Sequence, residues 1–222
     1  MRFVILFLFV VLQSNAQLVS DSISNPRYFE DQFYIGLSYN FILNHPEGAN
    51  QRNLSYGLQG GIIKDIPLNR PGTKAIGIGV GLALNSYYSN LVADITGEDI
   101  TYSLNNDVTR SKLETHLLEF PLEFRWRNST AEEYKFWRIY GGVKAAYIVG
   151  ARSKYDLNDI SEGFKNTNLT KFQYGLTLNI GYNTFNLHAY YALTELFDGS
   201  ASVNGEVLQY RPFRIGLIFY IL

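Results

Sequence analysis

Apolar and polar residues alternate one by one in eight segments of the chain. Between residues 32 and 43, for example, Phe33, Ile35 and Leu37 alternate with small or polar residues. A period of two is typical of a β-strand with one apolar face, and a helix does not produce it. The pattern predicts strands over residues 32–43, 54–64, 74–87, 113–127, 136–150, 171–182, 185–193 and 211–222.

The two faces of these strands indicate a barrel that spans a membrane. Membrane strands need roughly 9–11 residues, whereas globular strands most often have five or six. One face carries bulky apolar groups and the other carries Gly, Asn, Glu and Arg, so a soluble lipocalin-like barrel is the less favoured alternative. Aromatic residues near the strand ends predict two interface girdles. One girdle is Tyr39, Phe41, Phe172, Tyr191 and Phe213, and the other is Phe33, Trp126, Trp137, Tyr182, Phe185 and Phe219.

The connections alternate between long and short. If the N-terminus is periplasmic, connections one, three, five and seven face outward, and these are the longer ones. The sixth is short enough for a tight turn at Asn183-Thr184. Long outer loops with short inner turns are typical of outer-membrane barrels. The predicted fold is an all-β, eight-stranded antiparallel up-and-down transmembrane β-barrel over residues 32–222.

The first sixteen residues have the features of a secretory signal peptide. Arg2 precedes an apolar run over residues 3–12, and Ser14, Asn15 and Ala16 offer a cleavage site before Gln17. A run of this length is too short to cross a bilayer as a helix; the alternative is a buried helix or strand. We therefore expect a signal peptide over 1–16 and a periplasmic lead-in over 17–31.

Composition removes several classes of function. The formal net charge of −1 on 222 residues gives no basic field for nucleic acid, and no nucleic-acid partner is expected. The chain has no cysteine, which excludes thiol catalysis, cysteine zinc sites and disulfide scaffolds.

An eight-stranded barrel has a lumen only wide enough for its own side chains, so we expect a packed polar core rather than a channel. Centring the fourth connection near 128–134 places Glu119 opposite Lys144 and Glu123 opposite Tyr140, with Arg138 diagonal to Glu123. The sixth turn places His188 opposite Asn179. The predicted lumen network is Glu119, Glu123, Arg125, Arg138, Lys144, Asn179, His188 and Arg214. Its expected role is structural, and the alternative is a proton path or ligand site.

Catalysis is not expected from this sequence. His45 falls in the first outer loop, His188 in the lumen, and His116 near the outer end of the fourth strand, with Ser111 and Glu114 nearby. A nucleophile, a base and an orienting group within hydrogen-bond reach are not grouped around any of them.

Other candidate features are weaker. The alternating glycines Gly77, Gly79 and Gly81 leave lumen space and do not form a phosphate loop. Asp94, Glu98, Asp99 and Asp107 offer a weak calcium site or, more simply, a solvated loop face. We expect no cofactor and no metal. Pro121 must lie at a bulge or lose a ladder hydrogen bond.

The run over 117–126, Leu-Leu-Glu-Phe-Pro-Leu-Glu-Phe-Arg-Trp, and the end of the chain over 213–220 resemble the PorT-like outer-membrane β-barrel family. The overall plan resembles the OmpA/OmpX-type eight-stranded barrel. The resemblance implies an integral outer-membrane location, no catalysis and, for some members, a part in type IX protein secretion and gliding. The chain departs from many such barrels by ending in Leu222 rather than an aromatic residue, so Phe219 and Tyr220 would serve the insertion machinery.

The functional expectation is a non-enzymatic barrel of the Gram-negative bacterial cell outer membrane. It would be an accessory or structural subunit of an outer-membrane secretion or assembly machine, similar to type IX secretion. The alternatives are a stand-alone adhesion or membrane-integrity barrel and, third, a lipid A-modifying enzyme. Expected partners are outer-membrane lipid and other outer-membrane or periplasmic proteins.

Overall fold

The computed structural model describes residues 31–97, 99–128, 137–157, 160–182 and 185–221. The predicted signal peptide, 1–16, and all of the lead-in except Asp31 lie outside these residues. Among the described residues, none forms a helix with the length and apolar content needed to cross a membrane.

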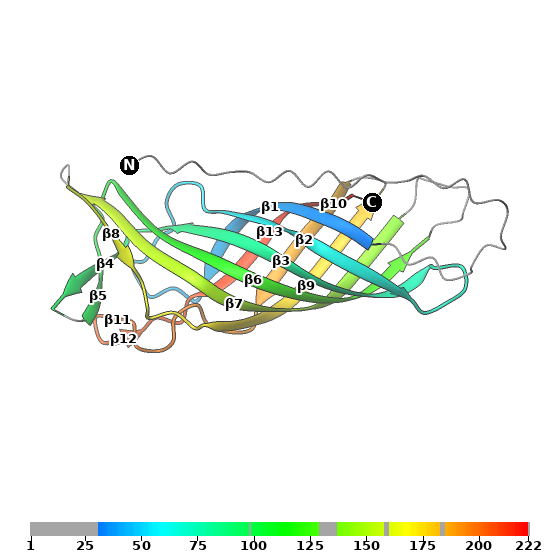
Figure 1. Ribbon diagram of the computed structural model, residues 1–222. Helices are drawn as coiled ribbons and strands as arrows, with labels where there is room; N and C mark the ends of the chain where they lie inside the picture. Colours follow the sequence, from blue (N-terminus) through cyan, green and yellow to red (C-terminus); the bar gives the residue numbers. More distant parts are fainter. Residues whose placement is uncertain (1–30, 98, 129–136, 158–159, 183–184, 222) are drawn as a thin grey trace, which may run out of the picture.

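Eight antiparallel strands form a closed barrel (Figure 1). They are β1 (Asp31–Leu43), β2 (Tyr56–Pro67), β3 (Lys74–Tyr88), β6 (Arg110–Arg127), β7 (Trp137–Leu157), β9 (Phe172–Tyr182), β10 (Phe185–Ala192) and β13 (Arg211–Ile221). Each strand pairs with its neighbours in the chain, β1 pairs with β13, and β6 pairs with β7. Because a closed sheet has no free edge, each barrel strand is paired with a neighbouring strand on both of its sides. The predicted fold class is confirmed.

The outer end contains strands in segments that were predicted to be loops. β4 (Leu91–Thr96) and β5 (Asp99–Leu104) form a hairpin, β8 (Ile160–Lys165) pairs with the end of β7, and β11 (Ser202–Val203) pairs with β12 (Glu206–Val207). All five lie at the left end of Figure 1, beyond the barrel wall. The outer connections therefore contain paired β-strands in addition to loops.

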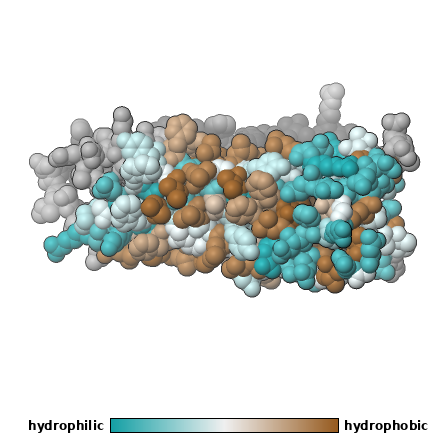
Figure 2. Space-filling model, turned by 180° about the vertical axis from the view of Figure 1, so that it is seen from behind, coloured by the Kyte–Doolittle hydropathy of each residue, from teal (hydrophilic) through white to brown (hydrophobic). Residues whose placement is uncertain are grey.

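Side chains alternate between lipid and lumen as the pattern predicted. Along β1, Phe33 is 57% exposed and Leu37 56%, while Asn40 is fully buried. Phe172 on β9 reaches 72% exposure. Figure 2 shows the result on one face of the molecule: hydrophobic side chains cover its middle, and hydrophilic ones gather towards the outer end at the right. This band is the surface that a bilayer core would cover.

β6 and β7 pair in a register two residues away from the predicted one. Glu119 lies opposite Ala146, and Lys144 lies opposite Pro121, so the predicted opposition of Glu119 and Lys144 is wrong. The prediction assumed a turn centred near 128–134, and the observed pairing is centred later in that connection. Turn geometry sets the register of a hairpin, and this turn had no sequence signature.

The same shift moves the next pair of predicted partners. Glu123 lies opposite Gly142 rather than Tyr140, and Tyr140 lies opposite Arg125. By contrast, His188 lies opposite Asn179, as predicted from the sixth turn.

Pro121 does not lie at a bulge. The register between β3 and β6 is the same on both sides of it, from Ile78–Leu122 to Gly81–Glu119, but Phe120 and Pro121 drop out of this ladder. On the other side of β6, Pro121 keeps its place opposite Lys144 of β7. Of the two predicted outcomes, the lost ladder bond is therefore the one observed. The irregularity of the β6–β7 pairing lies instead between His116 and Leu117, where β7 contains one extra residue, Val149.

Candidate functional site in the barrel lumen

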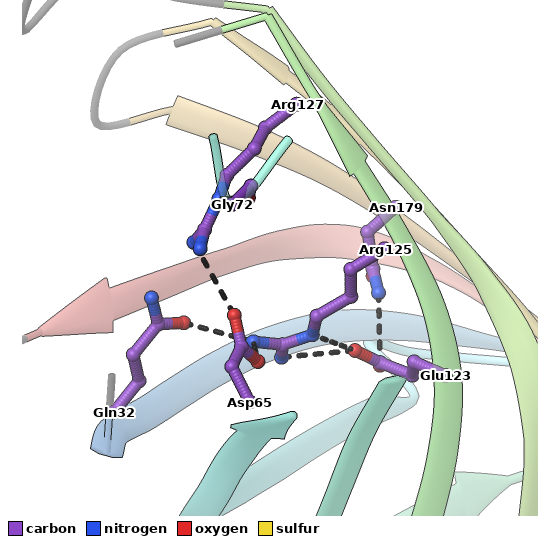
Figure 3. Close-up of polar contacts among 7 residues, drawn as sticks. All are labelled: Gln32, Asp65, Gly72, Glu123, Arg125, Arg127 and Asn179. Atoms are coloured by element: carbon purple, nitrogen blue, oxygen red, sulfur yellow. Dashed lines mark hydrogen bonds and ion pairs between the residues drawn. The ribbon is translucent and has the colours of Figure 1, made fainter. Parts of the chain in front are cut away.

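The lumen near the end where β1 begins and β13 ends, which is the predicted periplasmic end, is organised around Arg125 (Figure 3). Its Nη1 donates to Asp65 Oδ1 at 2.5 Å and to Gln32 Oε1 at 3.0 Å, while its Nε donates to Glu123 Oε2 at 3.0 Å. Arg125 and Asp65 side chains are each only 1% exposed. A guanidinium is suited to this position because its planar fork can serve two carboxylates at once.

Two aromatic rings and a glycine surround the Arg125 guanidinium and accommodate it. Arg125 lies over the rings of Tyr140 and Tyr220, with centroid distances of 4.5 and 5.0 Å. On the adjacent strand, a Cβ on Gly77 would lie 2.6 Å from Arg125 Nε. The glycine on β3 therefore leaves lumen space for the arginine of β6, which was the role predicted for it.

Asp65 joins two arginines and was not among the predicted site residues. Its Oδ2 accepts from Arg127 Nη1 at 3.2 Å, and Arg127 Nε donates to the Gly72 carbonyl at 2.8 Å. Sequence reasoning missed Asp65 because the second strand was predicted to end at 64. Continuing the alternation by one residue would have placed Asp65 on the lumen face.

A second charged layer lies around Glu119. Lys144 Nζ donates to Glu119 Oε2 at 2.9 Å and to Gln59 Oε1 at 2.6 Å. Arg214 Nη1 lies 3.6 Å from Glu119 Oε1 and donates to Asn85 Oδ1 at 3.1 Å. The pairing of Glu119 with Lys144 exists, although the two residues are diagonal rather than opposite, because the long lysine side chain reaches along the strand.

Asn179 extends the layer around Arg125 as far as His188. Its Nδ2 donates to Glu123 Oε1 at 3.2 Å, and its Oδ1 lies 2.6 Å from His188 Nδ1. All three side chains are buried. The structure thus brings together the predicted residues Glu123, Asn179 and His188.

Arg138 is the predicted lumen residue that the structure places differently. It lies opposite Arg127 at the periplasmic end of the β6–β7 ladder and is half-buried. The predicted diagonal position of Arg138 beside Glu123 is wrong, again because of the two-residue shift in register.

The buried charged side chains of the described barrel nearly balance. They are the carboxylates Asp65, Glu119 and Glu123 and the cations Arg125, Arg127, Lys144 and Arg214. Each carboxylate lies within 4 Å of at least one of these cations. Because an unpaired buried charge is costly, mutual pairing is what allows these residues to fill the lumen.

An apolar cap closes the lumen at its outer end. Buried side chains from the outer strands and connections pack together there: Ile42, Tyr87, Leu91, Leu169, Leu196, Phe197, Val203, Leu208 and Tyr210. Tyr102 packs on this cap with its ring 5.3 Å from that of Phe197 and donates to Asn166 Oδ1. Burial raises the pKa of Tyr102 to about 12. Sequence reasoning placed Ile42 and Tyr87 at the ends of predicted strands and the other cap residues named above in connections, and it did not predict the cap.

The predicted interface aromatics lie on the lipid-facing surface near the two ends of the barrel. At one end Phe41 packs near Tyr39 and Phe213, with centroid distances of 4.7 and 6.1 Å. At the other end Trp137 packs on Tyr182 at 5.2 Å and Phe185 near Phe219 at 6.0 Å. Trp126 is 38% exposed at that same end, on the strand next to Trp137.

The remaining candidate residues lie apart from the lumen. His45 follows β1 in the first outer connection. His116 points outward, and its Nε2 lies 3.4 Å from Glu114 Oε1. The described residues contain no cluster of three or more metal-ligating side chains, and Glu98 of the suggested calcium loop lies outside them.

Comparison with known proteins gives one family match. The family model described as "Outer membrane protein beta-barrel domain" matches residues 15–198. Among solved structures, the chain is similar to Ail, the attachment invasion locus protein of Yersinia pestis. The two are 13% identical, the alignment covers 86% of this chain and 97% of that one, and the TM-score is 0.36. No curated protein matches the chain.

Proposed function

Because the chain belongs to the family of outer membrane protein beta-barrel domains, we propose that it is a non-enzymatic, non-conducting barrel that serves as an accessory subunit in the outer membrane. In this proposal its outer end engages another outer-membrane protein, and the barrel holds that end in place. Outer-membrane lipid surrounds its apolar belt.

The observation that carries the proposal is the closure of the lumen. Two layers of paired charges fill its interior, and the apolar cap covers its outer end. Because its own side chains occupy the interior, binding to a partner has to use the outer surface of the barrel. The main such surface beyond the membrane belt is the outer end, which is formed by β4, β5, β8 and the extended β6 and β7. Hairpins that protrude with free strand edges are suited to contacts with protein.

The process in which we place this subunit is protein secretion or outer-membrane assembly of the type IX kind. The support is the mid-barrel run over 117–126, which resembles the PorT-like family. Within that run Glu119, Glu123 and Arg125 anchor both lumen layers. A stand-alone adhesion or membrane-integrity barrel is the second candidate, and the protruding β4–β5 hairpin is the observation that favours it.

Co-purification in mild detergent distinguishes these two roles. An affinity-tagged chain is expressed in its own host, and a variant in which the tip of the β4–β5 hairpin, residues 94–101, is replaced by a two-residue turn serves as the matched sample. A stoichiometric membrane protein that is captured with the unaltered chain supports the accessory role. Capture of no partner, together with unchanged export of surface proteins in a deletion strain, would contradict it.

The absence of enzymatic activity is part of the proposal. Its support is the pairing of the buried polar groups with one another: His188 contacts Asn179, and Glu119 contacts Lys144. Mass spectrometry of lipid A from the deletion strain provides the test. An unchanged acyl and phosphate pattern is expected, and loss of a modification that the gene restores would contradict this part.

A further inference from the structure

A group of cations faces outward where the lipid-facing belt ends. On β6, Lys112 and Glu114 have the same orientation as the exposed Phe120 and Leu122, because all are separated by even numbers of residues. The outward cations of this region, which we call the cationic flank, are Lys112, Arg152, Lys154 and Lys165 on β6, β7 and β8.

The cationic flank lies at the depth of lipid headgroups. A strand rises about 3.3 Å per residue and is tilted roughly 40° in such barrels, which gives about 2.5 Å of height per residue. Leu118 is the last outward apolar residue of β6. Glu114 and its cross-strand partner Arg152 then lie roughly 10 Å above Leu118, and Lys112 roughly 15 Å above it. The headgroup region begins directly beyond the hydrocarbon core.

The pairing of the strands sets like charges opposite each other twice. Lys112 lies opposite Lys154, and Arg152 lies opposite Lys165. Like charges directly opposite each other destabilise a sheet. Among the described residues, Lys112 is offset by Glu114 at 2.5 Å and Lys154 by Asp156 at 3.7 Å, whereas neither Arg152 nor Lys165 forms an ion pair with a carboxylate. The flank therefore has an excess of positive charge that an external anion would offset.

A groove between these strands offers the space for such an anion. It has a volume of about 260 Å³ and is lined by the cations Lys112, Arg152 and Lys154, the carboxylates Glu114 and Glu162, and Ser161 and Gly163. The cations outnumber the carboxylates in this lining. Gly163 is important here: a Cβ at this position would lie 3.2 Å from Arg152 Nη2, so the glycine lets the guanidinium lie across β8. The groove is open to the outside of the barrel, on the side that faces lipid.

We propose that the cationic flank binds the phosphate groups of a phosphorylated glycolipid in the outer leaflet. The lipid's acyl chains would lie along the apolar belt below Leu118, and its phosphates would be bound by Arg152 and Lys165, with Lys112 and Lys154 above them. This assignment goes beyond the proposed accessory role, and it would hold with or without a protein partner.

The test uses the full chain, refolded in neutral detergent. It is titrated with bisphosphorylated lipid A or with the same lipid after removal of both phosphates, and bound lipid is counted by native mass spectrometry. We expect the phosphorylated form to bind more tightly, and its advantage to shrink between 50 and 500 mM salt (about the range where screening becomes strong). Equal binding of the two forms would overturn the proposal, and this comparison needs no variant.

Matched variants locate the site. Arg152→Gln with Lys165→Gln should weaken phosphorylated lipid binding roughly 10- to 30-fold, since a basic residue near an anionic surface contributes about 1 kcal/mol. The exchange Arg152→Lys with Lys165→Arg keeps the charge and should retain binding. Arg70→Gln with Lys74→Gln removes the same charge from exposed residues near the opposite end of the barrel and should have no effect. An equal loss in that control pair, or no loss in the first pair, would refute the assignment.

Discussion

At the scale of single residues, the lumen is held together by charges that need one another. Glu119 is completely buried, and its carboxylate lies 2.9 Å from Lys144 and 3.6 Å from Arg214. Glu119→Ala leaves two buried cations without their shared anion, so we expect it to lower the free energy of unfolding by about 3–5 kcal/mol. Adding Lys144→Ala should recover part of that loss. Urea unfolding in detergent micelles measures both variants.

The exposed pair of Lys64 and Asp31 is the control for this cycle. Their side chains are 57% and 63% exposed, so Asp31→Asn should change the unfolding free energy by less than about 1 kcal/mol. Strictly additive effects of the Glu119 and Lys144 substitutions would contradict the pairing.

Two adjacent glycines on β7 give a second test at this scale. A Cβ on Gly142 would meet the Leu122 carbonyl oxygen and lie 2.7 Å from Glu123 Cα, whereas a Cβ on Gly141 would meet nothing within 4 Å. Backbone atoms cannot move aside cheaply. Gly142→Ala should therefore destabilise the barrel by about 1–3 kcal/mol, and Gly141→Ala should stay within about 0.5 kcal/mol of the unaltered chain. Equal changes in the thermal unfolding of the two variants would contradict the prediction that, of the two positions, only Gly142 lacks space for a side chain.

The sequence predicted which residues enter the lumen better than it predicted their contacts. Alternation alone assigns Glu119, Glu123 and Arg125 to the inner face, because a period of two leaves no other choice. Contacts depend also on register and on long side chains. Lys144 reaches Glu119 despite the wrong register, whereas Arg138 does not take its predicted place.

At the scale of elements, the sequence predicted the strands correctly wherever one face of the strand is directed towards lipid. The bilayer demands bulky apolar groups there, so the pattern is regular from Lys74 to Tyr87 and from Phe172 to Tyr182. Beyond the membrane this demand ends. The outer parts of β6 and β7 carry charged residues on their outward face, and both strands therefore run further than the apolar pattern indicated.

The outer part of β6 gives a test that depends on pH. A hydrogen bond from Lys112 lowers the pKa of Glu114, which lies outside the membrane-spanning part of the strand. Because the folded pKa is depressed, this contact stabilises the fold above the ordinary pKa of a glutamate and is lost as pH falls through the lowered value. An NMR titration of the Glu114 carboxyl should show a midpoint below that of a free glutamate. Lys112→Met should raise this midpoint, and an unmoved midpoint would mean that Lys112 is not the cause.

At the scale of the whole molecule, the number of strands predicts that side chains fill the lumen. It does not predict the apolar cap. Eight strands leave room for side chains alone, and this was evident from the sequence. The cap draws on residues far apart in the chain, such as Ile42, Leu91, Leu169 and Phe197. Each lies in or next to a connection without a strong period of its own, so no local pattern indicates that they meet.

The charged layers in the lumen and the apolar cap each block the barrel, which leads to a prediction for ion transport. Planar bilayers that contain the refolded chain should show no steady conductance, in contrast to bilayers with a sixteen-stranded porin, because the buried side chains around Arg125 and Glu119 occupy the narrow lumen of an eight-stranded barrel. Heat-modifiable mobility in electrophoresis confirms insertion as a folded barrel. Phe197→Ala with Tyr210→Ala removes rings that pack 5.5 Å apart in the cap, and this variant should also stay closed, because the charged layers below remain. Discrete current steps in the unaltered chain would contradict the filled lumen. Steps in the cap variant alone would mean that the outer cap, rather than the charged layers, is what closes the barrel.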